Sequence, residues 1–301
     1  MPDAPPSTIP TSPAGAFALT GVLDLEVLPP PADALVAELQ DATDGPDDPA
    51  QFLCDRLVAA LPSGWQAIAA GVADDVVAPY LETELDAVAP SFANGIRSLA
   101  AGVGYLAHHA QTIETLEVQP SGYATRTITG VAYGATTIDF ASDGISDAIA
   151  TTTVTLDVAG NLQLAEHRIA LPYGRLLRLG FDRQVIPNVD LSATDLAGAL
   201  RDLVDCAQLG ALFAEKVGVG TANMYEVACN AGMAALAADI YNQFAAIDAA
   251  PMEFAVAGTA LGVDIDGDGT MDEIENGLWS GTSSYADTAA PLVDATFAGT
   301  K

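Results

Sequence analysis

The hydrophobic pattern of the chain begins with an alternation of apolar and polar residues over 17–27, in which Phe17, Leu19 and Leu23 are the first apolar positions. A period of two predicts a β-strand with one buried face. The period then lengthens, and apolar residues recur at helical spacing over 32–40, 49–61 and 63–110. Each of these stretches predicts amphipathic helix, with two longer helices in the last of them.

Period-two patterning returns over residues 116–181. Val154, Leu156 and Val158 alternate with polar residues, and Gly160-Asn161 then separates them from a second alternating run, which predicts a β-hairpin. A further strand is expected at 174–181. Beyond it the pattern predicts helices within 194–246, followed by strands at 252–263, 274–285 and 293–300.

The order of these elements separates strands from helices and lacks the alternation that builds a parallel sheet. It predicts an α+β fold, with a curved antiparallel sheet packed on or wrapped around the long helices at 63–110 and 194–246. Residues 1–14 are rich in Pro, Ser and Thr and are expected to be a disordered tether. Residues 15–301 are expected to form a single α+β domain, in which an acidic loop at 264–275 connects two strands.

That acidic loop has the spacing of a calcium site. Calcium takes six to eight oxygen ligands, and the EF-hand loop supplies them from alternating positions around a central glycine. Gly269 occupies the glycine position, and Met271 the apolar position that anchors such a loop. The predicted ligands are the carboxylates of Asp264, Asp266 and Asp268, the carbonyl of Thr270, Asp272 directly or through water, and both carboxylate oxygens of Glu275.

The residues around the loop do not favour the two helices of an EF-hand, because Gly258, Gly262 and Gly277 flank it and Trp279 lies in a strand-like pattern. The segment 264–275 resembles the calcium loops of dockerins and thrombospondin type 3 repeats. This resemblance implies ligands and a structural ion that pins a strand connection, but no fold. Loops of this kind outside the cytosol bind calcium at roughly 10⁻⁴ to 10⁻³ M. A solvated acidic turn is the alternative.

Acidic residues outnumber basic residues by 40 to 10, for a formal net charge of −30. Such a field repels phosphate, so neither nucleic acid nor an anionic lipid surface is expected as a partner. No run of about 18 apolar residues occurs, and no transmembrane segment is expected. Adaptation to high salt would explain the same charge.

The start of the chain has neither the basic nor the apolar segment of a signal peptide. It resembles the linker after the lipid-carrying cysteine of bacterial lipoproteins, which implies a signal or lipid anchor ahead of Met1. The whole chain resembles uncharacterised, acidic, Ala-rich exported lipoproteins of Gram-negative bacteria. We therefore expect an extracytoplasmic protein, in the periplasm, on the outer membrane surface or secreted; an ordinary frayed terminus is the alternative.

The three cysteines form no C-x-x-C pair, which argues against a zinc cluster. Cys206 and Cys229 lie near the ends of neighbouring predicted helices. Two alternatives stay open: a disulfide between these two cysteines, or three buried thiols that include Cys54.

The only histidines are His108, His109 and His167, which could meet at a transition metal with Glu114 or Glu166. Adjacent histidines on a helix point about 100° apart, however, so both rarely serve one ion. We expect surface or helix-terminal histidines instead.

Gly277-Leu278-Trp279 resembles the G-x-W motif near the first strand of lipocalin-like barrels. Here the tryptophan comes late in the chain, so the order is not that of the motif. A buried structural tryptophan is expected.

No Walker lysine and no nucleophile elbow occurs, and no catalytic or organic-cofactor residue is expected. The sequence favours a non-enzymatic exported or envelope protein that is stabilised by one calcium ion. It would act through contacts with an unidentified protein partner in the envelope or at the cell surface. A carrier of lipid or another apolar ligand, held between helices and curved sheet, is one alternative. A calcium-dependent hydrolase is the other.

Overall fold

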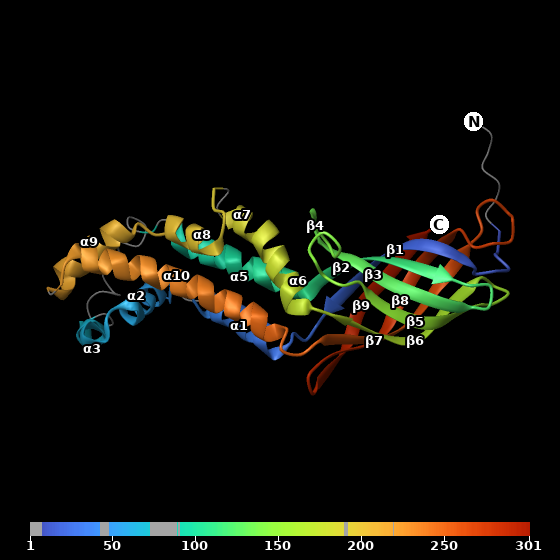
Figure 1. The fold of residues 1–301 in the computed structure, drawn as a ribbon, viewed down its shortest axis with the longest axis horizontal. Coiled ribbons are helices and arrows are strands. Elements are labelled where there is room, and N and C mark those ends of the chain that lie inside the picture. The colour runs from blue at the N-terminus through green and yellow to red at the C-terminus, as the bar shows by residue number, and fades with distance from the viewer. Residues whose placement is uncertain (1–7, 43–47, 73–88, 90, 190–191, 219) are drawn as a thin grey trace. The chain divides into compact units, whose positions relative to one another are not determined.

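A computed structural model describes residues 8–42, 48–72, 89, 91–189, 192–218 and 220–301 (Figure 1). The first part of the predicted tether and much of the helical pattern after residue 72 lie outside these residues. The chain divides into two compact units. The barrel unit comprises Met1–Pro29, Leu106–Gly180 and Ile247–Lys301, and the helical unit comprises Pro30–Tyr105 and Phe181–Ala246.

The barrel unit holds one antiparallel sheet, as the period-two patterns predict. Its strands are β1 (Gly15–Leu25), β2 (His109–Val118), β3 (Tyr123–Tyr133), β4 (Thr136–Asp139), β5 (Ala148–Leu156), β6 (Asn161–Leu171), β7 (Met252–Val263), β8 (Glu273–Tyr285) and β9 (Thr288–Thr300). The hairpin predicted around Gly160 is confirmed, since β5 and β6 pair antiparallel across it.

The sheet closes on itself. Hydrogen-bonded neighbours follow the order β2-β1-β9-β8-β7-β6-β5-β3, and β3 pairs in turn with β2. Eight strands therefore form a closed barrel, and β4 is an additional strand paired with β3. Closure leaves none of the eight strands with an unpaired edge.

The predicted α+β architecture, a curved sheet packed on or wrapped around long helices, is wrong. Because the sheet is a closed barrel, its own inward side chains fill its core. Arg126, Trp279 and Phe297 lie in that interior and are at most 4% exposed. The sequence pattern could not reveal this, since an open sheet and a closed barrel show the same alternation of buried and exposed residues.

The strand predicted at 174–181 is also wrong, because α6 (Tyr173–Gly180) and a π-helical turn (Phe181–Val185) occupy this stretch. Leu176, Leu177 and Gly180 are all buried. They recur at the three- and four-residue spacing that one helix face requires.

The helical unit confirms the helical patterns over the residues that are described. Its helices are α1 (Pro30–Asp41), α2 (Asp48–Ala60), α3 (Ser63–Val72), most of α5 (Phe92–His108), α7 (Ile186–Val189), α8 (Leu196–Asp202), α9 (Cys206–Val217) and most of α10 (Ala222–Ile247). A disulfide between Cys206 and Cys229 joins the start of α9 to α10, so the bridged alternative is the one that the structure adopts. Cys54 is buried in α2, outside this bridge.

Candidate metal centre

The acidic loop leaves β7 at Val263 and enters β8 at Glu273. Gly267 and Gly269 both have positive φ, at 78° and 87°. Such backbone costs glycine little, and the tight turn predicted at Gly269 is confirmed. Met271 is completely buried beneath the loop, which agrees with its predicted role as an apolar anchor.

The turn brings three carboxylates together. Ligand oxygens of Asp264, Asp266 and Asp268 all lie within 4.8 Å of one another, with Asp264 buried and the other two exposed. The N–H groups of Gly267 and Gly269 donate to the two oxygens of Asp264, at 2.7 and 2.9 Å. These two bonds orient the Asp264 carboxylate within the turn.

Two of these carboxyl groups, Asp264 and Asp268, have lowered pKa values, which favours their ionised form. Burial would raise the pKa of Asp264, but hydrogen bonds from Thr8 and from backbone N–H groups of the loop outweigh it and lower that pKa. The hydroxyl and N–H of Thr270 both donate to Asp268, at 2.6 and 2.7 Å, and lower its pKa. Ionised oxygens at this spacing suit a hard cation such as calcium.

The remaining predicted ligands do not belong to this group of three. Asp272 accepts a hydrogen bond from the N–H of Ile265 at 2.9 Å, which ties the two ends of the loop together. Glu275 lies within β8, paired with Leu261, and its side chain is exposed. Bidentate closure by Glu275 and the carbonyl ligand from Thr270 stay predictions.

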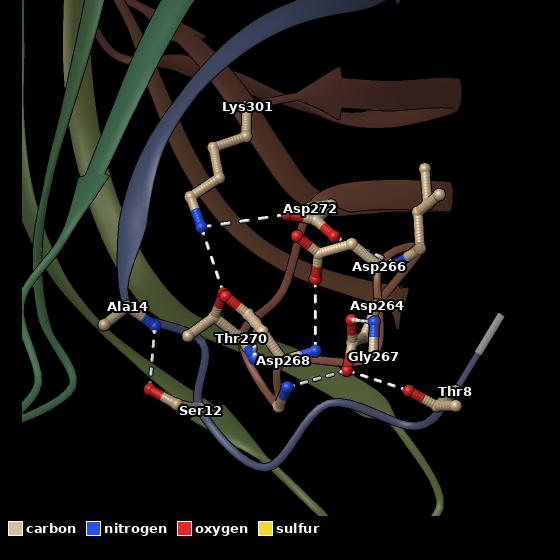
Figure 2. Close-up of polar contacts among 12 residues, drawn as sticks. Thr8, Ser12, Ala14, Asp264, Asp266, Gly267, Asp268, Thr270, Asp272 and Lys301 are labelled. Atoms are coloured by element: carbon tan, nitrogen blue, oxygen red, sulfur yellow. Dashed lines mark hydrogen bonds and ion pairs between the residues drawn. The ribbon is translucent and has the colours of Figure 1, made fainter. Parts of the chain in front are cut away.

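Lys301 follows β9 and reaches the loop, a contact that sequence reasoning missed. Its Nζ lies 3.1 Å from the Thr270 hydroxyl oxygen and 3.7 Å from an Asp272 carboxylate oxygen (Figure 2). Its backbone N–H donates to the Asp272 carbonyl at 2.8 Å. No local signal links a residue so distant in sequence to the loop.

The segment Thr8–Ser12, which we call the N-terminal strap, lies along the loop. The N–H of Thr8 donates to the carbonyl of Asp264 at 2.7 Å, and the Thr8 hydroxyl donates to its carboxylate at 2.8 Å. The carbonyl of Gly269 accepts from the N–H groups of Thr11 and Ser12, at 2.9 and 3.1 Å. Part of the segment predicted as a tether thus has a defined place against the loop.

The histidines serve other purposes. His108 and His109 bond to the Leu25 carbonyl and the Asp24 carboxylate, respectively, at 2.5 and 2.8 Å. His167 is buried inside the barrel, where its Nε2 faces Arg126. Over the part of the chain that the structure describes, no histidine joins a group of three potential metal ligands.

A charged network occupies the barrel interior, and we call Thr112, Glu114, Arg126, His167 and Trp279 the interior polar layer. Arg126 donates to both oxygens of Glu114, at 2.5 and 2.8 Å, and the Thr112 hydroxyl also donates to Glu114. Arg126 lies 4.1 Å from the centre of the Trp279 ring and 3.1 Å from Nε2 of His167.

This arrangement favours the neutral form of His167. Nδ1 of His167 lies 2.9 Å from the Ala165 carbonyl, so the proton belongs on Nδ1 and Nε2 accepts from Arg126. Burial lowers the pKa of His167, and the charge of Arg126 lowers it further against the opposing effects of Ala165 and Glu114. The expected buried tryptophan is confirmed, with Trp279 stacked on Phe297 at 4.1 Å.

Comparison with family models, with curated proteins and with solved structures finds no match to this chain. Within the described ranges, no helix combines the length and apolar character needed to span a membrane.

Proposed function

We propose that this is a non-enzymatic extracytoplasmic protein, acting through protein contacts, whose barrel is braced by one structural calcium ion. The convergence of Asp264, Asp266 and Asp268 within 4.8 Å carries the proposal. Oxygen-only donors on a tightly turned loop favour calcium over transition metals, which prefer nitrogen or sulfur ligands. Thr270, Asp272 and Glu275 would complete the coordination.

The proposed location outside the cytosol has two supports. Calcium loops of this kind fill at millimolar concentrations of the ion, which occur outside cells. The Cys206–Cys229 disulfide suits an oxidising compartment. A lipid anchor and an envelope partner remain part of the proposal.

A hydrolase is less well supported by the same geometry. General acid–base catalysis needs a group whose pKa lies near the working pH. The pKa values of Asp264 and Asp268 are lowered instead, which favours ligation over proton transfer.

The packing of the barrel interior around the interior polar layer gives little support to a lipid carrier. A Cβ atom added at Gly258 would lie 2.7 Å from the Trp279 ring, and one at Gly277 would lie 2.7 Å from the Phe297 ring. Since such contacts are closer than packing allows, side chains fill the barrel there.

Thermal unfolding with and without calcium tests the proposal. Trp279 fluorescence reports unfolding of the barrel, in a Trp65→Phe background that removes the second tryptophan of the chain. With a dissociation constant of roughly 10⁻⁴ M, free calcium at roughly 2 mM should stabilise the barrel by about 2 kcal/mol relative to EDTA. Asp266→Asn should abolish most of this gain, whereas Asp287→Asn, in the turn between β8 and β9, should retain it. Identical melting in calcium and EDTA would refute the structural role of the ion.

A further inference from the structure

The N-terminal strap is joined to the acidic loop by several backbone and side-chain hydrogen bonds. The strap pairs with the loop at two isolated bridges, Thr8 with Asp264 and Ser12 with Thr270. Backbone bonds run in both directions, because Asp264 and Met271 donate back to the carbonyls of Thr8 and Ser12, at 3.1 and 3.0 Å. The loop is therefore a docking surface whose occupant is this segment of the same chain.

Two acceptor atoms of these bonds are positioned by the folded shape of the loop. The Thr8 hydroxyl donates to Oδ2 of Asp264, the oxygen that also accepts from Gly269. The carbonyl of Gly269 accepts from the N–H and the hydroxyl of Thr11 and from the N–H of Ser12. A loop that opened would lose the alignment of both acceptors.

Charge interactions among the loop carboxylates affect the stability of that loop shape. The carboxylates of Asp264, Asp266 and Asp268 repel one another at their short separation, and a divalent cation converts this repulsion into attraction. The Lys301 ammonium lies beside the loop, 3.1 Å from the Thr270 hydroxyl oxygen and 3.7 Å from an Asp272 carboxylate oxygen. Cation binding and strap docking thus favour the same loop conformation.

We infer that docking of the N-terminal strap and calcium loading of the 264–275 loop are thermodynamically linked, so that calcium fixes the N-terminal segment against the barrel. The inference rests on the proposed calcium site and adds a regulated part to it. Linkage is reciprocal, so the strap must raise calcium affinity by the same factor by which calcium favours strap docking.

Calorimetric titration of the full chain with calcium chloride measures one side of this linkage. Thr11→Pro removes the two Thr11 donors to the Gly269 carbonyl and leaves the Ser12 N–H. Thr8→Val removes the hydroxyl donor to Asp264 while keeping the shape of the side chain. Thr11→Pro should weaken calcium binding about tenfold, and Thr8→Val by a smaller factor. Thr296→Val, on an exposed face of β9, is the matched control and should leave the affinity unchanged.

Hydrogen–deuterium exchange measures the other side. In EDTA the amides of Thr8, Thr11 and Ser12 should exchange about tenfold faster than in calcium, while central amides of β1 stay protected. Calcium binding with equal affinity in Thr11→Pro and the parent, together with unchanged exchange in the strap, would overturn the linkage alone. A parent chain that takes up no calcium would overturn both the proposed site and the linkage.

Discussion

Replacing Glu114 with glutamine is expected to destabilise the barrel by about 3–5 kcal/mol, the usual cost of breaking a buried ion pair. The substitution keeps the shape of the side chain and removes its charge. Arg126 would then carry a buried positive charge without a counterion, because its remaining neighbours in the interior polar layer are the neutral His167 and the ring of Trp279.

The size of this loss follows from burial and geometry. The side chains of Arg126 and Glu114 are 1% and 0% exposed, so water cannot solvate the charge that remains. Two charge-assisted hydrogen bonds join the pair, and such bonds are about twice as strong as neutral ones. Glutamine can accept only one of them without presenting its own N–H₂ group to the guanidinium.

Urea unfolding followed by Trp279 fluorescence, in a Trp65→Phe background, measures the loss. Glu117→Gln, on the exposed face of the same strand, should change the stability by less than about 0.5 kcal/mol. The double variant Glu114→Leu with Arg126→Met should lose much less than Glu114→Gln, because no charge remains buried. A single variant as stable as the parent, or a double variant less stable than Glu114→Gln, would refute this reasoning.

Three further predictions concern pH, charge and the disulfide. Because the pKa of His167 is lowered in the folded protein, its contribution to stability is complete above the pKa of the unfolded state, near 6.5. That contribution is lost as the pH falls from this value towards the pKa of the folded state. In urea titrations between about pH 7.5 and 5.5, His167→Gln should therefore lose less stability than the parent. Lys301→Met removes a positive charge beside the loop and should tighten calcium binding about threefold to tenfold at low salt, and less at 0.15 M ionic strength. Calorimetry measures this change, and Lys216→Met in the helical unit should leave the calcium affinity unchanged. Replacing Cys206 and Cys229 with serine should destabilise the helical unit by about 3 kcal/mol, visible as an earlier loss of helical circular dichroism, and an unchanged transition would contradict this.

Local features of the fold could be predicted from the sequence, and its closure could not. The hairpin at Gly160 and the long helix α10 each depend on patterning within one stretch of chain, and both are confirmed. Closure depends on the pairing of β1 with β9, two strands that are remote from each other in sequence. Register shifts inside several of the strand pairings also shape the barrel, and no periodicity reveals where they fall.

The candidate site divides in the same way. The alternation of aspartates and the position of Gly269 follow from local spacing, and the structure brings three of the predicted ligands together. The N-terminal strap and Lys301 lie far apart in the sequence, so their shared contacts with the loop depend on the completed barrel. The interior polar layer escaped prediction for a related reason, since Glu114 and Arg126 fall at inward positions only once the register of β2 and β3 is known.

The place of the loop in this topology explains why an ion there would brace more than one hairpin. Val263 and Glu273 pair at the very ends of β7 and β8, so the loop starts where that ladder stops. The N-terminal strap ends two residues before β1, and Lys301 directly follows β9. Thr300 of β9 pairs with Ala18 of β1 and with Glu273 of β8. Fixing the loop therefore restrains four neighbouring strands at one end of the barrel. Removal of calcium should accordingly increase amide exchange at the start of β1 and the end of β9 as well as in the loop, and an effect confined to β7 and β8 would show that the ion acts on the hairpin alone.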